Sequence, residues 1–402
     1  MDSRDRLLKA IHHEEPDRVP VAPRIGARLV PWLRPQDGPH WKREYEMFKQ
    51  FGFDPYVEGV PPPGLEGIPI LPSFWPTSHV PPGLQGVSVE VEVHEFDLEY
   101  EIVTRTIKTP EGILRDRIKV PKPDKLAKMR ESWNSTCPPS WFPDAVPFTV
   151  ERLVKTAQDA EKIRFILPDP DGVDEREIDQ ANRYLGRDGL IAYIVNPIDQ
   201  MLYAVGLREG IIAYYRQREI LEILLRIFFE HSLAVTRSLL ERGAEIIFHG
   251  NYMGGASAGW NPNIWNGLFK PMIKSNRDLV KAMGGIFQYY DDGNLMKLLG
   301  GLKEIQPDVL TIAPSRFGND FKQMKLTIGD RVCLKGGIDP DTVRFETTDR
   351  IEGEIRESIG AAARGGGFIL SSSDSIHAYT PLANIRSIVN FGVKYGGYPI
   401  EC

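Results

Sequence analysis

The sequence predicts an α/β fold: a (β/α)8 TIM barrel with an antiparallel β-hairpin inserted in its N-terminal half and proline-rich loops. From residue 148 onward, helical patterns alternate with short apolar runs, which is typical of a parallel sheet covered by helices. About eight β/α units can be counted, and eight units favour a closed barrel over an open sheet. No Gly-x-Gly-x-x-Gly fingerprint follows the first strand, so a dinucleotide-binding fold is not indicated.

The expected barrel strands are short and apolar, and amphipathic helices separate them. The strands are expected at residues 18–23, 55–57, 190–195, 245–248, 285–290, 309–312, 332–334 and 368–370. The best-marked helices are expected at residues 217–241, 263–283, 349–364 and 381–395. We therefore expect a single domain over residues 1–402, with its active site at the carboxyl ends of the strands.

The N-terminal half has a different residue pattern: prolines cluster there, and one region alternates apolar with polar residues. Between about residues 86 and 122, runs such as Val-Glu-Val-Glu-Val repeat with period two, and Thr109-Pro-Glu-Gly112 separates two of them. Such alternation indicates antiparallel strands with one solvated face, and the Pro-Glu-Gly sequence indicates a turn. We expect this region to form a β-hairpin or small sheet inserted into the barrel domain.

The composition argues against several classes of protein. The chain of 402 residues is 42% hydrophobic and 26% charged, and its formal net charge is −6, so we expect no nucleic-acid surface. We also expect no signal peptide and no membrane span. The three cysteines are far apart and lack metal-binding spacing, which fits a reducing cytoplasm. Cys333 is expected in a buried strand.

The most informative motif is the pair Asp291-Asp292, which follows the strand at 285–290 and precedes Gly293-Asn294. Two adjacent carboxylates repel each other, so we expect a metal, an arginine or a proton between them. The structural alternative is an N-cap for the next helix, which Asp292 or Asn294 could provide. We interpret Asp291 and Asp292 as catalytic residues.

Other strands also end in polar groups, which a barrel would bring to one mouth. With the two aspartates, His249, Asp374 and His377 form a set that suits a divalent metal or general acid–base catalysis, with His377 as a further catalytic residue. A loop hydrogen bond for His249 and a turn cap for Asp374 are the structural alternatives. Substrate contacts are expected from Arg24, Arg28, Asn196, Asn251, Tyr252, Tyr290 and Trp260, although the aromatic residues could equally be ordinary packing.

Several short motifs are spread along the whole chain. It opens with Arg6-Leu-Leu-Lys-Ala-Ile and Glu14-Glu-Pro-Asp-Arg-Val-Pro-Val21, continues with Asp292-Gly-Asn294 and Gly336-Gly-Ile-Asp-Pro340, and closes with Thr380-Pro-Leu-Ala-Asn384 and Tyr395-Gly-Gly-Tyr-Pro399. In these motifs and their order the chain resembles the uroporphyrinogen decarboxylase superfamily, which implies a (β/α)8 barrel. The reaction stays open, because that superfamily contains cofactor-free porphyrinogen decarboxylases. It also contains zinc-dependent methyltransferases that use a corrinoid protein or a thiol.

Differences from the family patterns bear on this choice. The decarboxylases carry an Arg-Gln-Ala-Gly-Arg loop that grips carboxylates, and Arg24-Ile-Gly-Ala-Arg28 keeps both arginines at that spacing. Thiol-directed methyltransferases carry His-x-Cys at one strand end and Cys on the last strand. This chain has Tyr290-Asp291-Asp292 and Asp374 there, without a thiolate ligand. The resemblance then implies an oxygen-rich metal site of Asp292, Asp374 and His249, similar in kind to that of relatives that demethylate ethers.

Three functions are open at this point. The first is a methyltransferase that moves a methyl group from a small methylated (methoxylated) substrate to a corrinoid protein. Either zinc or another divalent metal assists the transfer, or an Asp or His protonates the leaving oxygen without a metal. Cobalamin would then be carried by the partner protein. The second is a decarboxylase of a porphyrinogen or another polycarboxylate, which needs no bound cofactor. The third is a barrel that binds a ligand without catalysis. We expect a cytoplasmic protein without nucleic-acid or membrane partners, for which a homodimer is allowed.

Overall fold

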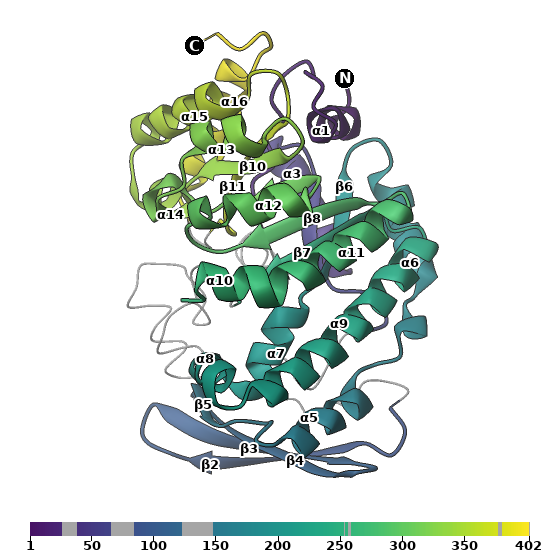
Figure 1. The fold of residues 1–402 in the computed structure, drawn as a ribbon. Helices are drawn as coiled ribbons and strands as arrows, with labels where there is room; N and C mark the ends of the chain where they lie inside the picture. Colours follow the sequence, from purple (N-terminus) through teal and green to yellow (C-terminus); the bar gives the residue numbers. More distant parts are fainter. Residues whose placement is uncertain are drawn as a thin grey trace. The chain divides into compact units, whose positions relative to one another are not determined.

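The computed structural model describes residues 1–25, 38–65, 84–122, 148–252, 254–255, 259–376 and 380–401 (Figure 1). The chain divides into two compact units. The barrel unit comprises Met1–Val60, Glu175–Val195 and Leu239–Cys402, and the second unit comprises Pro61–Asp174 and Asn196–Ser238. Among the described residues, no helix is both long enough and apolar enough to span a membrane.

The barrel unit is built on seven parallel strands in the order β1-β6-β7-β8-β9-β10-β11. Their bounds are β1 (Tyr56–Val60), β6 (Leu190–Val195), β7 (Ile246–Asn251), β8 (Ile286–Asp291), β9 (Val309–Thr311), β10 (Cys333–Ile338) and β11 (Phe368–Ser372). All seven coincide with expected strands to within a few residues. Each is buried along nearly its whole length, which explains why the sequence shows apolar runs instead of alternation.

The eighth strand position is taken by the segment around Val21, which joins the two edge strands of this sheet. Val21 forms a parallel bridge with Leu370 of β11. Its carbonyl oxygen accepts a hydrogen bond of 2.9 Å from the backbone N–H of Asp54, just before β1. Pro20 and Pro23 cannot donate backbone hydrogen bonds, which explains a single bridge in place of a regular strand. The predicted (β/α)8 barrel is therefore confirmed.

A buried carboxylate fastens this closure. Asp54 is fully buried and accepts hydrogen bonds from Arg6 Nη1 at 2.6 Å, Arg18 Nη1 at 2.7 Å and the Val21 backbone N–H at 2.8 Å. Arg6 lies on α1 (Ser3–Ile11), so Asp54 joins the first helix, the first strand position and β1. The N-terminal motifs that carry Arg6 and Arg18 are thus part of the closure of the barrel.

Helices connect the barrel strands. They are α1, α3 (His40–Phe51), α6 (Glu175–Leu185), α10 (Pro262–Ile264), η5 (Trp265–Phe269), α11 (Lys270–Ala282), η6 (Met296–Leu298), α12 (Leu299–Ile305), η7 (Ser315–Phe317), α13 (Phe321–Ile328), α14 (Pro340–Phe345), α15 (Thr348–Ala362) and α16 (Leu382–Tyr395). The helix expected at 263–283 is interrupted by the π-helical turn η5. Pro271 explains the interruption, because it cannot donate the backbone hydrogen bond that a continuous α-helix needs there.

The second unit contains the expected hairpin within a four-stranded antiparallel sheet, in the order β2-β3-β4-β5. The strands are β2 (Ser88–Glu95), β3 (Tyr100–Thr109), β4 (Gly112–Pro121) and β5 (Phe148–Glu151). The helices assigned to this unit, wholly or in large part, are α5 (Ala157–Lys162), η2 (Ile163–Ile166), η3 (Pro170–Gly172), α7 (Pro197–Val205), α8 (Leu207–Arg216) and α9 (Arg218–Glu241). The sequence did not predict β5, which is only four residues long.

Candidate active site

Arg24 lies at the carboxyl end of the first strand position, where its backbone is held on both sides. Its N–H donates to Ser372 Oγ at 2.9 Å, and its carbonyl accepts from the backbone N–H of Ile376 at 2.8 Å. Both partners belong to β11 or to the loop after it. The closure of the barrel therefore fixes where the Arg24 side chain starts, at the end of the sheet where barrel active sites lie.

Three aromatic rings surround the Arg24 guanidinium. Its central carbon lies 5.7 Å from the ring centroid of Phe248, 5.2 Å from Tyr252 and 5.3 Å from Tyr290, which are cation–π distances. Nη2 also donates to the Tyr252 hydroxyl. Burial raises the pKa of Tyr252, although the neighbouring guanidinium acts in the opposite direction, so Tyr252 stays protonated at neutral pH. The predicted residues Arg24, Tyr252 and Tyr290 thus come together.

Two carboxyl groups border this aromatic cluster. Asp374 Oδ1 lies 3.6 Å from Arg24 Nη1, and Asp292 accepts a hydrogen bond from the Tyr290 hydroxyl. Burial, together with the charge of Asp374, raises the pKa of Asp292 to about 7, although the Tyr290 hydrogen bond lowers it. Near neutral pH a large share of Asp292 is therefore a protonated acid beside a buried cation. A positioned group of this kind can donate a proton to a reacting atom.

Below this cluster, a fully buried ion pair crosses the barrel. Lys335 Nζ on β10 lies 3.1 Å from Glu58 Oε1 on β1, and Gln288 Nε2 donates to Glu58 Oε2 at 2.6 Å. Arg24 Nε lies 3.7 Å from the same Glu58 Oε1. Burial alone would raise the pKa of Glu58, but Lys335 and Arg24 outweigh it and hold that pKa below its ordinary value. Glu58 is thus an ionised carboxylate between two cations.

Sequence reasoning did not single out Glu58, Lys335 or Gln288. The signal available was a charged or amide residue inside an apolar strand, because such residues are rarely buried unless they are paired. That signal says that a partner exists but not which one. The partners lie 277 residues apart for Lys335 and Glu58, and 230 apart for Gln288 and Glu58.

Asp291 lies on the opposite face of the strand from Asp292, although its charge still contributes to raising the pKa of Asp292. Successive side chains of a strand point to opposite faces of the sheet, and Asp292 shares the inner face with Tyr290. Asp291 accepts hydrogen bonds from the Tyr289 hydroxyl at 2.7 Å and from Asn251 Nδ2 at 3.0 Å. Asn251 therefore binds Asp291 instead of lining the aromatic cluster.

A loop packs closely against the Asp291 carboxylate. A Cβ atom at Gly255 would come within 1.9 Å of Asp291 Oδ1, and Asn251 Oδ1 accepts from the backbone N–H of Gly254 at 3.1 Å. Asp291 is fully buried in this arrangement. Asp291 and Asn251 thus bind each other and contact Gly254 and Gly255, and their expected roles in catalysis and in substrate binding stay predictions.

His249 shares this outer face and does not meet Asp292 and Asp374. Its Nδ1 lies 3.1 Å from Asn276 Nδ2 on α11, and its ring packs against Phe287 and Tyr289. Burial lowers the pKa of His249 to about 3, so the ring is neutral. The expected ligand set of Asp292, Asp374 and His249 is not assembled, because strand alternation directs His249 to the helix layer.

The fit of a metal can be tested on the donors that remain. Within the described parts of the chain, no three His, Cys, Asp or Glu side chains are grouped closely enough to hold a metal ion. Asp292 and Asp374 alone provide two carboxyl groups, and one of them binds Tyr290. These residues by themselves do not form a zinc site, which usually has at least three protein ligands. A bound metal stays a prediction, and no step below depends on it.

The other predicted residues have separate positions. Trp260 is buried and packs edge-on against Phe269, with ring centroids 5.1 Å apart. Asn196 lies at the N-cap of α7 in the second unit, where its Oδ1 accepts from Gln200 Nε2 at 3.4 Å. Arg28 and His377 lie outside the described residues, so their expected roles stay predictions. Cys333 is fully buried on β10, as expected.

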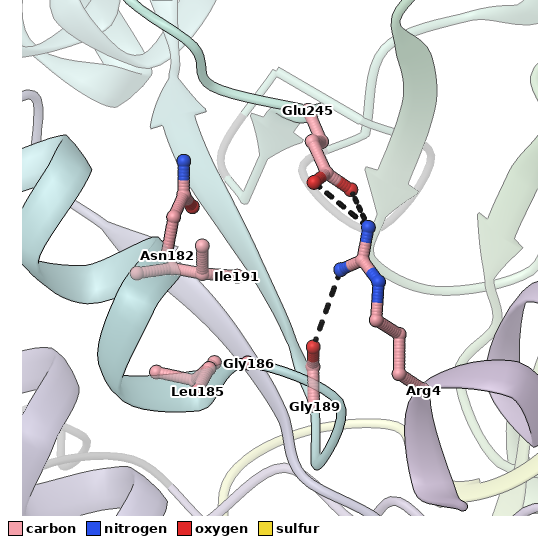
Figure 2. A pocket seen from close by; sticks show the side chains of 7 residues that line it. All are labelled: Arg4, Asn182, Leu185, Gly186, Gly189, Ile191 and Glu245. Carbon is pink, nitrogen blue, oxygen red and sulfur yellow. Dashed lines mark hydrogen bonds and ion pairs between the residues drawn. The ribbon is translucent and has the colours of Figure 1, made fainter.

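A pocket is present at the opposite end of the strands, near the starts of β6 and β7 (Figure 2). It encloses about 250 Å³ and is lined by Arg4, Asn182, Leu185, Gly186, Gly189, Ile191 and Glu245. Arg4 Nη2 lies 2.6 and 2.8 Å from the two carboxylate oxygens of Glu245, so the charges of the pocket neutralise each other. None of the predicted site residues lines it. The cluster around Arg24 therefore remains the candidate active site.

Comparisons with known proteins relate this geometry to a family. The sequence model of the family described as Uroporphyrinogen decarboxylase (URO-D) matches residues 142–395. A uroporphyrinogen decarboxylase from Chlorobium luteolum is 28% identical over 127 residues, which cover 30% of this chain and 34% of that protein. One from Pseudoalteromonas atlantica is 29% identical over 76 residues, covering 19% and 21%. The aligned part thus spans about a third of the first relative and about a fifth of the second.

A solved structure is similar over nearly the whole chain. The structure of a methyltransferase from Methanosarcina mazei superposes with a TM-score of 0.62, covering 98% of this chain and 99% of that one. The sequence identity is 15%, so this likeness concerns the fold alone. Neither group of similar proteins specifies the reaction of the cluster around Arg24.

Proposed function

The chain belongs to the uroporphyrinogen decarboxylase family, and from this premise we propose that it is a methyltransferase that demethylates a small methoxylated substrate. The observation that carries the proposal is the position of Asp292, an acid held by Tyr290 at the edge of an aromatic-walled cluster. Rings of this kind suit a small, largely apolar molecule, and the acid suits a leaving oxygen that needs a proton.

The charges of the cluster support a small substrate over a porphyrinogen. A porphyrinogen with many carboxylates needs several arginines or lysines free to bind them. Of the described cations, Lys335 is bound by Glu58 at 3.1 Å, and Arg24 lies between Glu58 and Asp374. Because these cations already have carboxylate neighbours, they can neutralise at most a small number of anionic groups of a substrate. A methoxylated molecule with one such group matches it better than a polycarboxylate does.

In the proposed reaction, the bond between the methyl carbon and the substrate oxygen breaks. Its electron pair stays on the oxygen, which receives the Asp292 proton, while Tyr290 keeps the acid oriented towards the cluster. Arg24 and the aromatic rings hold the substrate so that its oxygen faces Asp292. The acceptor we propose is a separate corrinoid protein, whose reduced cobalt centre would supply the nucleophile for the methyl group.

Turnover with free cob(I)alamin tests this proposal without the partner protein. Methoxybenzoates and other methyl ethers would be mixed with the protein and cob(I)alamin, and the formation of methylcobalamin would be followed by its absorbance. We expect Asp292→Asn to lower the rate by roughly 10²–10⁴, because a general acid contributes about that much. The matched control is Asp278→Asn at an exposed ion pair on α11, which should leave the rate unchanged. Equal rates in wild type and Asp292→Asn would contradict the proposal.

One observation favours decarboxylation as the second candidate. Arg24 is a buried guanidinium at a strand end, and a carboxylate substrate would find a partner there. In that reaction the bond to the departing CO₂ breaks, its electron pair stays on carbon, and Asp292 protonates that carbon. Release of CO₂ from uroporphyrinogen, lost in Asp292→Asn, would establish this alternative. Ligand binding without any turnover would instead indicate a binding barrel.

A further inference from the structure

Strand β6 contains one residue that stays partly exposed, although the rest of the strand is buried. This residue is Ile194. Ile191 on the same strand faces the helix layer, because it lines a pocket together with Leu185 of α6 (Figure 2). Side chains alternate along a strand, so Ile194 points the opposite way, into the barrel. Solvent reaches the inside of a closed barrel through its mouth, so the candidate active site extends as far as Ile194.

Gly250 brings Ile194 close to the aromatic cluster. It follows the outward-facing His249 on β7, so position 250 faces the interior of the barrel. A Cβ atom at Gly250 would lie 3.0 Å from Ile194 Cδ1 and 2.9 Å from Tyr252 Cε2. Ile194 and Tyr252 thus occupy the space that a side chain at Gly250 would need. The two side chains flank the bare backbone of β7 and form one continuous wall.

Ile194 supplies an apolar contact where the other accessible groups of the cluster are polar. The Arg24 and Asp374 side chains are 12% and 17% exposed, and Tyr252 and Asp292 are also partly exposed. The remaining rings of the cluster are fully buried. Binding sites for small molecules combine an apolar wall with a few polar groups that fix the orientation of the ligand. The apolar part of a substrate therefore finds its partner at Ile194, on the β6 side.

The strands that carry these groups limit the size of the substrate. Ile194 lies on β6 and Asp292 follows β8, with β7 between these two strands. Neighbouring strands are about 4.8 Å apart, so the backbones of β6 and β8 are separated by roughly 10 Å. Side chains extend inwards from both strands. The remaining span suits one six-membered ring with its methoxy group, and it is too short for two fused rings or four linked pyrroles.

We propose that Ile194 is a specificity-determining residue, which holds the single ring of a methoxylated substrate against Tyr252. Gly250 is a positioning residue for this wall, because it lets Ile194 and Tyr252 approach the backbone of β7. The inference deepens the proposed function by naming the substrate class, a flat molecule with one ring. It rests on that function for the methoxy group. The contact itself can be measured without methyl transfer.

Isothermal calorimetry with 4-methoxybenzoate and 6-methoxy-2-naphthoate tests the wall, because these ligands differ by one fused ring. We expect the wild type to bind 4-methoxybenzoate more tightly. Ile194→Val removes the Cδ1 methyl group beside Gly250, and the affinity for 4-methoxybenzoate should fall roughly tenfold, as one methylene contributes in a substrate pocket. The matched control is Ile191→Val, which loses the same atom from the outer face of β6 and should bind like the wild type.

Ile194→Ala gives a second readout that a general loss of structure would not produce. The shorter side chain opens space on the β6 side of the wall. This variant should therefore gain affinity for 6-methoxy-2-naphthoate while it loses affinity for 4-methoxybenzoate. A loss of both affinities would contradict a wall at Ile194, provided that circular dichroism shows the variant to be folded.

Other results would also overturn the inference. These are no binding of 4-methoxybenzoate, an unchanged affinity in Ile194→Val, an equal loss in Ile191→Val, or equal wild-type affinities for the two ligands. The expected affinity changes without any formation of methylcobalamin would contradict only the proposed function. Methylcobalamin formation with the same KM for 4-methoxybenzoate in Ile194→Val and wild type would contradict only the role of Ile194.

Discussion

Replacing Lys335 by methionine tests whether the buried ion pair supports the barrel. Lys335 is completely buried, Glu58 is 2% exposed on its side chain, and their charged atoms are 3.1 Å apart. Methionine keeps most of the side-chain volume but leaves Glu58 as a buried carboxylate without its main counter-charge. Removing one partner of a buried pair costs roughly 3–5 kcal/mol of folding free energy, because the remaining charge is desolvated and uncompensated. We expect a loss of this size in Lys335→Met.

The assay is urea unfolding followed by circular dichroism, which measures the free energy of unfolding. The matched control is Lys274→Met, because Lys274 pairs with Asp278 on the surface of α11 and both side chains are nearly half exposed. An exposed pair contributes less than about 1 kcal/mol, so this control should unfold almost like the wild type. The double variant Glu58→Gln/Lys335→Met should recover much of the lost stability, because neither charge remains.

The pH dependence of stability gives an independent check, because the contribution of Glu58 should change in opposite directions with pH in the wild type and in Lys335→Met. In the wild type the pKa of Glu58 is held low, so its contribution to stability is present above the ordinary glutamate pKa and is lost as the pH falls. Without Lys335 the pKa of Glu58 should rise, so Lys335→Met should instead lose stability as the pH rises above about 4. A single variant within about 1 kcal/mol of wild type, or a double variant no more stable than the single, would refute this reasoning.

Two further substitutions test assignments made from the geometry. Asp54→Asn should lower the free energy of unfolding by about 3–5 kcal/mol, because it removes the charge that holds Arg6 and Arg18 at the closure of the barrel. An unchanged urea midpoint would contradict this role of Asp54. His249→Gln should leave the metal content per folded chain unchanged, because His249 faces Asn276 on the outer side of the sheet. Elemental analysis measures that content, and loss of a bound metal in the variant would show that His249 is a ligand.

Local patterns in the sequence were enough to derive the sheet. A barrel strand buried on both faces must be a short apolar run, and β6 (Leu190–Val195) occupies the expected residues without any shift. The alternating region likewise predicted β2 to β4, because a strand with one solvated face must alternate. The short strand β5 was missed, since four residues carry too little pattern to be recognised.

The placement of the candidate site was predicted in part. Arg24, Tyr252, Asp292 and Asp374 follow strand ends, and Tyr290 is the last residue but one of β8. A parallel sheet brings the ends of its strands together whatever the details of packing. The two carboxylates of the pair Asp291-Asp292 have different hydrogen-bond partners on opposite faces of the strand, although the charge of Asp291 still helps to raise the pKa of Asp292. Neighbours in a sequence suggest proximity, but a strand sends consecutive side chains to opposite faces, and no sequence pattern said that the strand continues through Asp291.

Residue patterns alone predicted the barrel, its inserted sheet and the strand ends that carry polar groups. They could do so because the apolar runs of buried strands and the alternation of half-exposed strands are visible within a few neighbouring residues. Which of those groups meet was decided by tertiary structure. Glu58 pairs with Lys335 across 277 residues, and Glu44 lies within the electrostatic reach of Arg24 only because α3 packs beside β1. The pKa values of Asp292 and Glu44 depend on burial and on charges from distant segments. Such terms exist only once the chain is folded.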